Sequence, residues 1–148
     1  MQHIKIKIQT PNTANDFEKY FDLRWRILRE PWQQPRGSEQ DELEKTSHHV
    51  MMCEGNNHVI GVGRLHAATD SQGQIRYMAV AITHQGKGIG SLLLNELERV
   101  AKEKLFNSIL LHARENALPF YLHHGYVLLE KSHLLFNSIQ HFKMVKHL

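Results

Sequence analysis

The sequence predicts one α/β (α+β) domain built on a mixed, mostly antiparallel central sheet of about seven strands flanked by helices. Short apolar or alternating runs, typical of strands, are interspersed with longer runs of helical periodicity. Two of the strand-like runs are joined by a short Gly/Asn link, the usual signal of an antiparallel hairpin. The 148 residues are enough for one domain with a core and too few for two, so residues 1–148 are expected to form a single domain.

Seven segments have strand patterns. The first alternates isoleucines with polar residues, the period-2 signature of a half-buried strand. The hairpin link is Glu54-Gly55-Asn56-Asn57, flanked by Val, Ile and Met. The predicted strands cover residues 4–8, 48–54, 58–68, 75–82, 108–112, 126–129 and 141–146.

Four segments are predicted to be helical. The first, residues 14–29, begins after Thr13, whose pairing with Asp16 resembles a capping box, and ends before Pro31. A Leu-rich segment over residues 88–104 has the spacing of an amphipathic helix. Two shorter helices are expected over residues 38–45 and 116–124.

Composition excludes several classes of protein. Hydrophobic residues make up 41% and charged residues 22%, and the net charge of +3 is scattered rather than clustered, so no nucleic-acid partner is expected. No apolar run approaches the ~18 residues of a membrane helix, and the first residues are no signal peptide, so no membrane partner is expected. The single Cys53 suits a reducing, cytoplasmic compartment and a packed thiol. The twelve histidines show no metal-ligand spacing, so no metal is expected.

A glycine-rich turn, Gln85-Gly86-Lys87-Gly88-Ile89-Gly90, leads from a buried strand into the Leu-rich helix. Such a turn exposes backbone N–H groups at the positive end of the helix dipole, where an anion binds. A P-loop would need Lys followed by Ser or Thr after the last glycine, and a dinucleotide fingerprint would need glycine where Ser91 stands. On its own, the motif could also be no more than a tight strand-to-helix turn.

Two blocks together resemble the GNAT superfamily of acyl-CoA N-acyltransferases. The first is Gln-x-x-Gly-x-Gly between an apolar strand and a Leu-rich helix, at Gln85–Gly90. The second runs from Ala113 to Tyr126 and is similar to the superfamily's Asn/Ala…Phe-Tyr-x-x-x-Gly-Phe/Tyr segment. The blocks have the expected order and separation, and the resemblance spans roughly residues 59–146. It implies the acyl-CoA N-acyltransferase fold.

The resemblance also implies where an acyl-CoA donor, most simply acetyl-CoA, would bind. Its pyrophosphate would lie on the backbone N–H groups of the glycine turn, with Lys87 adding a cationic contact. Its pantetheine arm would lie in a gap beside the preceding strand, often next to a bulge, with the Val80 N–H donating to the thioester oxygen. The implied donor-binding residues are Val80, Ala81, Ile82, Gln85, Gly86, Lys87, Gly88, Ile89, Gly90, Ser91 and Asn116. Asn116 could equally cap its own helix.

Transfer in this superfamily is direct, from the thioester to an amine. Tyr121 stands where the superfamily has a general acid for the departing thiolate. The carboxylate base that some branches carry on the strand before the glycine turn is absent between Gln74 and Ile82. His112 is the favoured replacement, with His66 or a water chain as alternatives.

The function expected is therefore N-acyltransfer, most simply N-acetyl transfer, to a primary amine of a small molecule or peptide. The alternative is a non-catalytic acyl-CoA-binding or sensing domain on the same fold. The acceptor pocket of the family usually forms near the positions of Arg24, Trp25, Arg29 and Trp32. A homodimer is a common arrangement for such folds.

Overall fold

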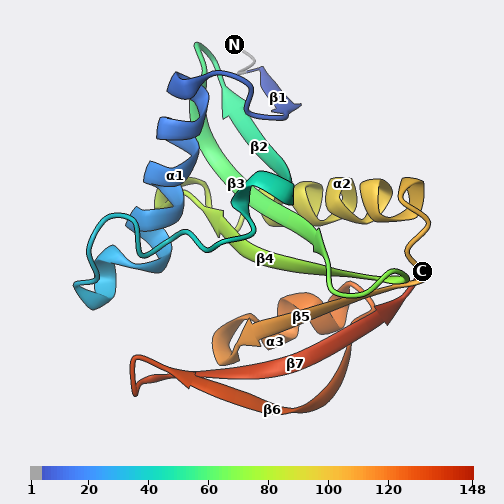
Figure 1. Cartoon of the computed structure of the whole chain (residues 1–148). Helices are drawn as coiled ribbons and strands as arrows, with labels where there is room; N and C mark the ends of the chain where they lie inside the picture. The colour runs from blue at the N-terminus through green and yellow to red at the C-terminus, as the bar shows by residue number, and fades with distance from the viewer. Residues whose placement is uncertain (1–4) are drawn as a thin grey trace.

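The computed structural model describes residues 5–148, and Figure 1 shows their arrangement as one twisted sheet with helices on both faces. The sheet has seven strands in the order β1-β2-β3-β4-β5-β7-β6. Only β4 and β5 pair in parallel, and every other neighbouring pair is antiparallel. The strands are β1 (Ile6–Gln9), β2 (His48–Glu54), β3 (His58–Ala67), β4 (Gln72–Val80), β5 (Ser108–Arg114), β6 (Val127–Leu135) and β7 (Ile139–His147). The predicted mixed, mostly antiparallel sheet is confirmed; Ile4 of the predicted first strand lies outside the described residues.

Three α-helices flank the sheet. They are α1 (Ala14–Leu28), α2 (Ile89–Glu103) and α3 (Leu118–His123), and the 3-10 turns are η1 (Glu30–Trp32), η2 (Glu44–Thr46), η3 (Ile82–His84) and η4 (Glu115–Ala117). The capping box that begins α1 is present, with the Asp16 N–H donating to the Thr13 hydroxyl at 3.0 Å. Within residues 5–148, no helix has the length and apolar character needed to cross a membrane.

Helices α1 and α2 cover opposite faces of β2–β4 (Figure 1). Gly63 of β3 faces α2 closely, since a Cβ built there would lie 2.9 Å from a methyl group of Leu97. Its neighbour Arg64 points to the other face and shares the carboxylate of Glu44 with Arg24 of α1. The core is therefore divided by the sheet into an α1 side and an α2 side.

The prediction of a helix over residues 38–45 is wrong. This segment forms turns and ends in the short η2. Its acids are bound elsewhere, because Asp41 pairs with Arg64 at 2.6 Å and Glu44 pairs with both Arg24 and Arg64. The Ser38 hydroxyl donates to the Pro35 carbonyl and so does not cap a helix. These tertiary ion pairs override the weak local helix signal.

The last two strands are longer than the predicted 126–129 and 141–146. They form one hairpin closed by Phe136 and Asn137, both with φ of 53°. Two successive positive φ values are typical of a type I′ turn, whose twist matches that of paired strands. The predicted strand stopped at residue 129 because the middle of β6, Glu-Lys-Ser-His, is polar and the strand is largely exposed.

A β-bulge in β4 determines the shape of the sheet beside the helices. Gly63 of β3 stands opposite both Tyr77 and Met78, and Tyr77 has φ of +61°, a rare conformation for a bulky side chain. Beyond the first residues of β4, pairing with β5 ends at Gln74 and Leu110. The two parallel strands then separate, and the gap between them is where the cavity lies.

Candidate active site

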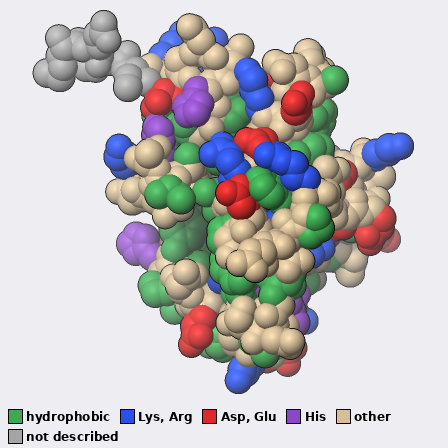
Figure 2. Space-filling model, turned by 90° about the vertical axis from the view of Figure 1, so that its left-hand side faces the viewer, with side chains coloured by type: hydrophobic (Ala, Val, Ile, Leu, Met, Phe, Trp, Pro, Cys, Tyr) green, Lys and Arg blue, Asp and Glu red, His purple; other side chains and the backbone are tan. Residues whose placement is uncertain are grey.

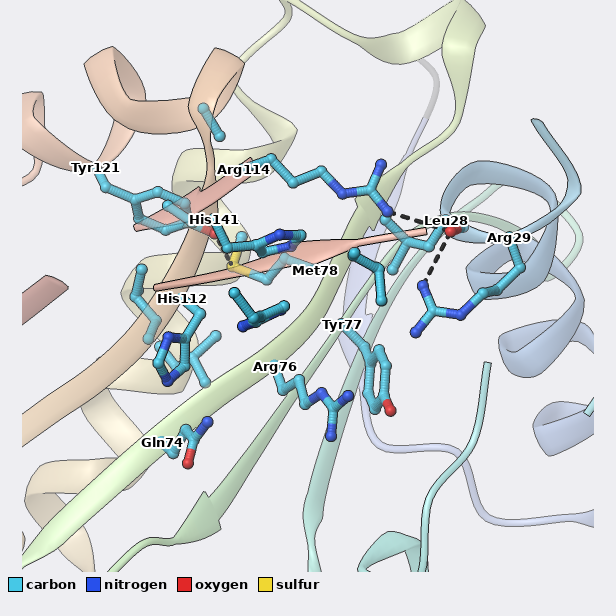
Figure 3. Close-up of a pocket in the computed structure, with 16 residues that line it drawn as sticks. Leu28, Arg29, Gln74, Arg76, Tyr77, Met78, His112, Arg114, Tyr121 and His141 are labelled. Atoms are coloured by element: carbon cyan, nitrogen blue, oxygen red, sulfur yellow. Dashed lines mark hydrogen bonds between the residues drawn. The ribbon is translucent and has the colours of Figure 1, made fainter. Parts of the chain in front are cut away.

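A cavity of about 360 Å³ lies where β4 and β5 separate. Residues from seven elements (α1, β4, β5, η4, α3, β6 and β7) line it, and Figure 3 shows how their side chains converge. Tyr121 enters from α3, Met78 from β4, His112 and Arg114 from β5, and Arg29 from the end of α1. The structure thus brings Tyr121 and His112, the two catalytic residues predicted from sequence, into the same cavity.

Tyr121 is buried, and its hydroxyl donates to the sulfur of Met78 at 3.5 Å. A thioether is a weak acceptor, so this phenol is held in place without being strongly bound. Burial raises the pKa of Tyr121 above its ordinary value of 10. The phenol therefore stays protonated near neutral pH and can serve as a proton donor.

His112 belongs to a group of three histidines on neighbouring strands. Its Nδ1 lies 3.0 Å from the Ser132 hydroxyl, and its ring centroid lies 5.5 Å from that of His133. His133 in turn stacks on His141 at 4.3 Å. Burial, followed by the nearby charge of His133, lowers the pKa of His112, and burial lowers that of His141 to about 4. Neutral imidazole, the form that accepts a proton, is therefore favoured in this group at neutral pH. The alternative base His66 contacts Arg64 and does not line the cavity.

The glycine turn is an open cradle at the start of α2. Gly86 and Gly88 have φ of +77° and +84°, and no atom lies within 4 Å of a Cβ built on either. Gly88 is the N-cap of α2 and supplies no side-chain cap. No side chain therefore caps the first N–H groups of the helix, an arrangement that is typical of anion-binding turns. Gly90 has a different role, because a Cβ there would lie 3.3 Å from the Phe120 ring.

The end of β4 offers backbone donors to the gap. The Ala81 N–H donates to the Ile60 carbonyl at 2.8 Å, and donors in an antiparallel pair alternate in direction. The Val80 N–H therefore points away from β3, toward the side where β5 has separated. The Gln85 amide donates to the Val80 carbonyl at 3.0 Å and ties the glycine turn to this strand end. Ile82 is 76% exposed at the start of η3.

None of the predicted donor-binding residues is among those that line the cavity holding Tyr121. Ser91 follows the glycine turn, and its hydroxyl lies 2.9 Å from Nε2 of His124. Lys87 is exposed, whereas Ile89 is buried against β3. Asn116 lies in η4 beside a second cavity and does not line the one that holds Tyr121. Its contact with the donor stays a prediction, as do those of the other residues.

An ion-pair network braces the α1 side of the cavity. Arg24 and Arg64 are fully buried and share Glu44. Arg64 also pairs with Asp41, which Arg76 reaches from the surface. The Lys, Arg, Asp and Glu side chains that Figure 2 shows on one face are surface side chains, whereas Arg24 and Arg64 lie beneath the surface. Arg24, predicted near the acceptor pocket, is therefore a structural residue. Trp25 likewise donates to the Gln34 carbonyl at 2.9 Å and packs under Arg36 at 4.1 Å.

Sequence reasoning missed four residues that line the cavity: Arg76, Arg114, His133 and His141. His133 lies beyond the predicted strand 126–129, because β6 was predicted too short. His141 lies within the predicted strand 141–146, but no local pattern shows that it faces the cavity. Arg114 alternates with the buried Ala113 on β5, a polar position that the strand pattern does reveal. Nothing in the sequence shows that it meets the end of α1.

The family model described as "Acetyltransferase (GNAT) family" matches residues 17–126. The chain belongs to this family, and its expected N-acyltransferase function is confirmed at that level. The chain is 31% identical over 126 residues to the uncharacterized N-acetyltransferase YjcF of Bacillus subtilis, a match that covers 85% of this chain and 89% of that protein.

Solved structures show the same fold at low sequence identity. An acyl-CoA N-acyltransferase from Pseudomonas aeruginosa superposes with a TM-score of 0.82 at 19% identity, covering 97% of this chain and 99% of that one. A GNAT family acetyltransferase from Elizabethkingia anophelis with acetyl-CoA bound gives a TM-score of 0.73 at 19% identity, covering 98% of both chains. The predicted acyl-CoA N-acyltransferase fold is confirmed.

Proposed function

We propose that this protein transfers the acetyl group of acetyl-CoA directly to the primary amine of a small molecule or peptide, within the cavity between β4 and β5. The observation that carries the proposal is the protonated phenol of Tyr121 in this cavity. The uncapped first turn of α2 and the Val80 N–H, which points to the side where β5 has separated, support it. The related acetyltransferase with acetyl-CoA bound supports the choice of donor.

The residues present fit this donor. The uncapped first turn of α2, with Gly86 and Gly88 open around it, suits a pyrophosphate. Lys87 is exposed beside the turn and adds a cation. The separated edge of β4 suits the pantetheine arm, whose amides can pair with backbone as an added strand would. The arm leads from the glycine turn toward Tyr121.

We assign one residue to each chemical step. His112 takes the proton that the incoming ammonium group must lose before its nitrogen attacks the thioester carbon. The Val80 N–H donates to the carbonyl oxygen, where negative charge develops as the carbon becomes tetrahedral. Tyr121 gives its proton to the sulfur as the C–S bond breaks, so that CoA leaves as the thiol. The nitrogen, now bonded to the acetyl carbon, loses its second proton to the Tyr121 phenolate, which restores the phenol. The products are the N-acetylated amine and CoA.

The proposal is tested by measuring thiol release from acetyl-CoA in the presence of a panel of primary amines. We expect release above the rate of acetyl-CoA hydrolysis for at least one class of amine. If acetyl-CoA raises the melting temperature but no amine stimulates release, the chain binds the donor without transferring it. That result would favour the sensing alternative.

Gly88→Ala should weaken acetyl-CoA binding. Alanine at φ of +84° costs roughly 1 kcal/mol and reshapes the first turn of α2, where the pyrophosphate is proposed to bind. We expect Kd for acetyl-CoA, measured by calorimetry, to rise about fivefold or more. Gly37→Ala is the matched control, since Gly37 has φ of +100° and equally open surroundings far from α2 in sequence. Equal effects of the two substitutions on Kd would contradict the cradle.

The pH dependence of turnover tests His112. Because burial and His133 lower its pKa below the ordinary 6.5, the neutral base predominates at pH 7 and is lost only on acidification. We expect kcat/KM to fall below an apparent pKa under 6.5 in the wild type. His112→Gln should reduce kcat/KM by roughly 10²-fold at pH 7 and flatten that acid limb. If kcat/KM of the variant fell at acid pH in the same way as that of the wild type, His112 would not be the general base.

A further inference from the structure

The cavity carries an unusual set of charges. Its lining includes three arginines and three histidines, and no Asp or Glu belongs to it: Arg29, Arg76, Arg114, His112, His133 and His141. Residues 1–4, which the structure does not describe, contain no carboxylate in their side chains either. A site for an amine that reacts as a cation would ordinarily be expected to include an acid. The electrostatic potential here favours an anion instead.

Two of the three arginines have no carboxylate partner among residues 5–148. Arg76 pairs with Asp41 at 2.8 Å. In contrast, Arg29 donates from Nη1 to the Leu28 carbonyl at 2.9 Å, and Arg114 donates from Nη2 to the same oxygen at 3.1 Å. Figure 3 shows both guanidinium groups turned toward this one carbonyl. A single neutral oxygen thus lies between two positive charges.

This arrangement is costly unless another group completes it. Arg29 is 6% exposed, and a buried charge without a counter-charge is strongly destabilising. Burial lowers the pKa of both groups, that of Arg114 to about 10, so both remain charged at neutral pH. Glu39 is the acid that acts on Arg29, but its carboxylate accepts from the Gly37 N–H and the Gln40 amide and forms no ion pair. The other groups that hold the two guanidiniums are neutral: Arg29 Nε donates to the Ser38 carbonyl at 3.0 Å, and Arg114 lies over the Trp32 ring at 4.6 Å. Among residues 5–148, neither arginine forms an ion pair with a carboxylate, so each can still accept one from a ligand.

The arginine pair lies on the side of the cavity away from the proposed donor path. Arg114 donates to the carbonyl of Leu28, the last residue of α1, and Arg29 is the next residue in the chain. Tyr121 comes from α3, and its partner Met78 lies close to Gly63 on the α2 side of the sheet. Figure 3 shows Tyr121 at one end of the cavity and Arg29 at the other. A donor that enters along α2 would leave the arginine end to the acceptor.

We infer that the acceptor is an amine that also carries a carboxylate, such as an amino acid, and that Arg29 and Arg114 bind this carboxylate. The inference rests on the proposed function and specifies its substrate class. A planar carboxylate offers two acceptor oxygens, and guanidinium groups bind that geometry through paired N–H donors. The amine of the same molecule would then be directed toward His112 and the thioester.

The test compares amino acids with their carboxamides, which keep the amine and the side chain but lack the negative charge. In a thiol-release assay with acetyl-CoA, we expect kcat/KM for at least one acid to exceed that of its amide by roughly tenfold to a hundredfold, the range for a charge-assisted hydrogen bond to a buried group. Arg114→Gln should remove most of this ratio by raising KM for the acid. Arg99→Gln, on the exposed face of α2, is the control and should leave the ratio unchanged.

Further outcomes separate this inference from the proposed function. Turnover of amides or of phosphorylated amines at rates equal to or above those of the acids would overturn the carboxylate assignment while leaving N-acetyl transfer intact. If no amine reacts, the proposed function fails. Calorimetry of the CoA-saturated protein with N-acetylamino acids and their amides then tests whether the arginine pair binds a carboxylate. Tighter binding of the acid than of its amide, lost in Arg114→Gln, would support the arginine pair, and equal binding would overturn it.

Discussion

Replacing Tyr121 with phenylalanine is expected to lower kcat by roughly 10²- to 10⁴-fold, the usual contribution of a positioned general acid. The substitution removes only the hydroxyl, whose contact is the weak acceptor sulfur of Met78. Little stability should therefore be lost, and Kd for acetyl-CoA should stay within about twofold of the wild-type value. The measurement pairs steady-state kinetics with calorimetric titration of the donor.

Tyr126→Phe is the matched control, because the two tyrosine rings lie 5.6 Å apart and only one of them lines the cavity. The Tyr126 hydroxyl donates to the Glu98 carboxylate at 2.9 Å, so its loss should destabilise the fold by about 1–3 kcal/mol. Its kcat should change little at temperatures where the variant remains folded. Equal kcat values for Tyr121→Phe and the wild type would exclude Tyr121 as the acid.

Arg64→Met should be the most destabilising substitution of a single charged residue. Arg64 is fully buried, and its guanidinium bridges Asp41, at 2.6 and 3.0 Å, to Glu44 at 2.8 Å. Removing it leaves two partly buried carboxylates that repel each other, and breaking a buried ion pair in this way costs about 3–5 kcal/mol. Urea unfolding of the two proteins measures the difference.

The exposed Arg99 supplies the comparison. It pairs with Glu96 and Glu103 on the surface of α2, and Arg99→Met should cost no more than about 1 kcal/mol. A loss for Arg64→Met as small as that for Arg99→Met would show that the network does not hold segment 38–46 in place.

Acid unfolding gives a second, independent readout of the same network. Burial alone would raise the pKa of Asp41, but the hydrogen bond and charge of Arg64 outweigh it and hold that pKa at about 2, below the ordinary 3.8. The stabilisation from Asp41 is therefore complete above pH 3.8 and is lost as the pH falls toward 2. Without Arg64, the pKa of Asp41 should rise, and acid unfolding should begin at higher pH.

Local patterns were sufficient to predict much of this fold and site. The capping box of α1, the Gly/Asn hairpin between β2 and β3, and the uncapped glycine turn before α2 all depend on neighbouring residues. Tyr121 and His112 could be named because one lies in a recognisable block and the other precedes it on a strand. Their meeting in one cavity confirms that they lie together, while their chemical roles stay predictions.

Features that depend on distant residues were not predictable. The segment 38–46 folds around guanidinium groups from α1 and β3, and those partners override its weak helix signal. The left-handed Tyr77 at the bulge is held between arginine side chains, with the Arg24 and Arg76 guanidinium carbons each 4.4 Å from its ring centroid. The pairing of Arg29 with Arg114 at the Leu28 carbonyl joins positions 85 residues apart in sequence, and no local pattern indicates it.

The most direct test of the central proposal follows an isotopically labelled acetyl group from acetyl-CoA to its product. With an amine substrate present, mass spectrometry should find one labelled N-acetyl amine for each free thiol of CoA. The wild-type protein should form this product, and Tyr121→Phe should form it at least about 10² times more slowly. Thiol release without a labelled amine, or donor binding without any release, would contradict the assignment of this cavity to N-acetyl transfer.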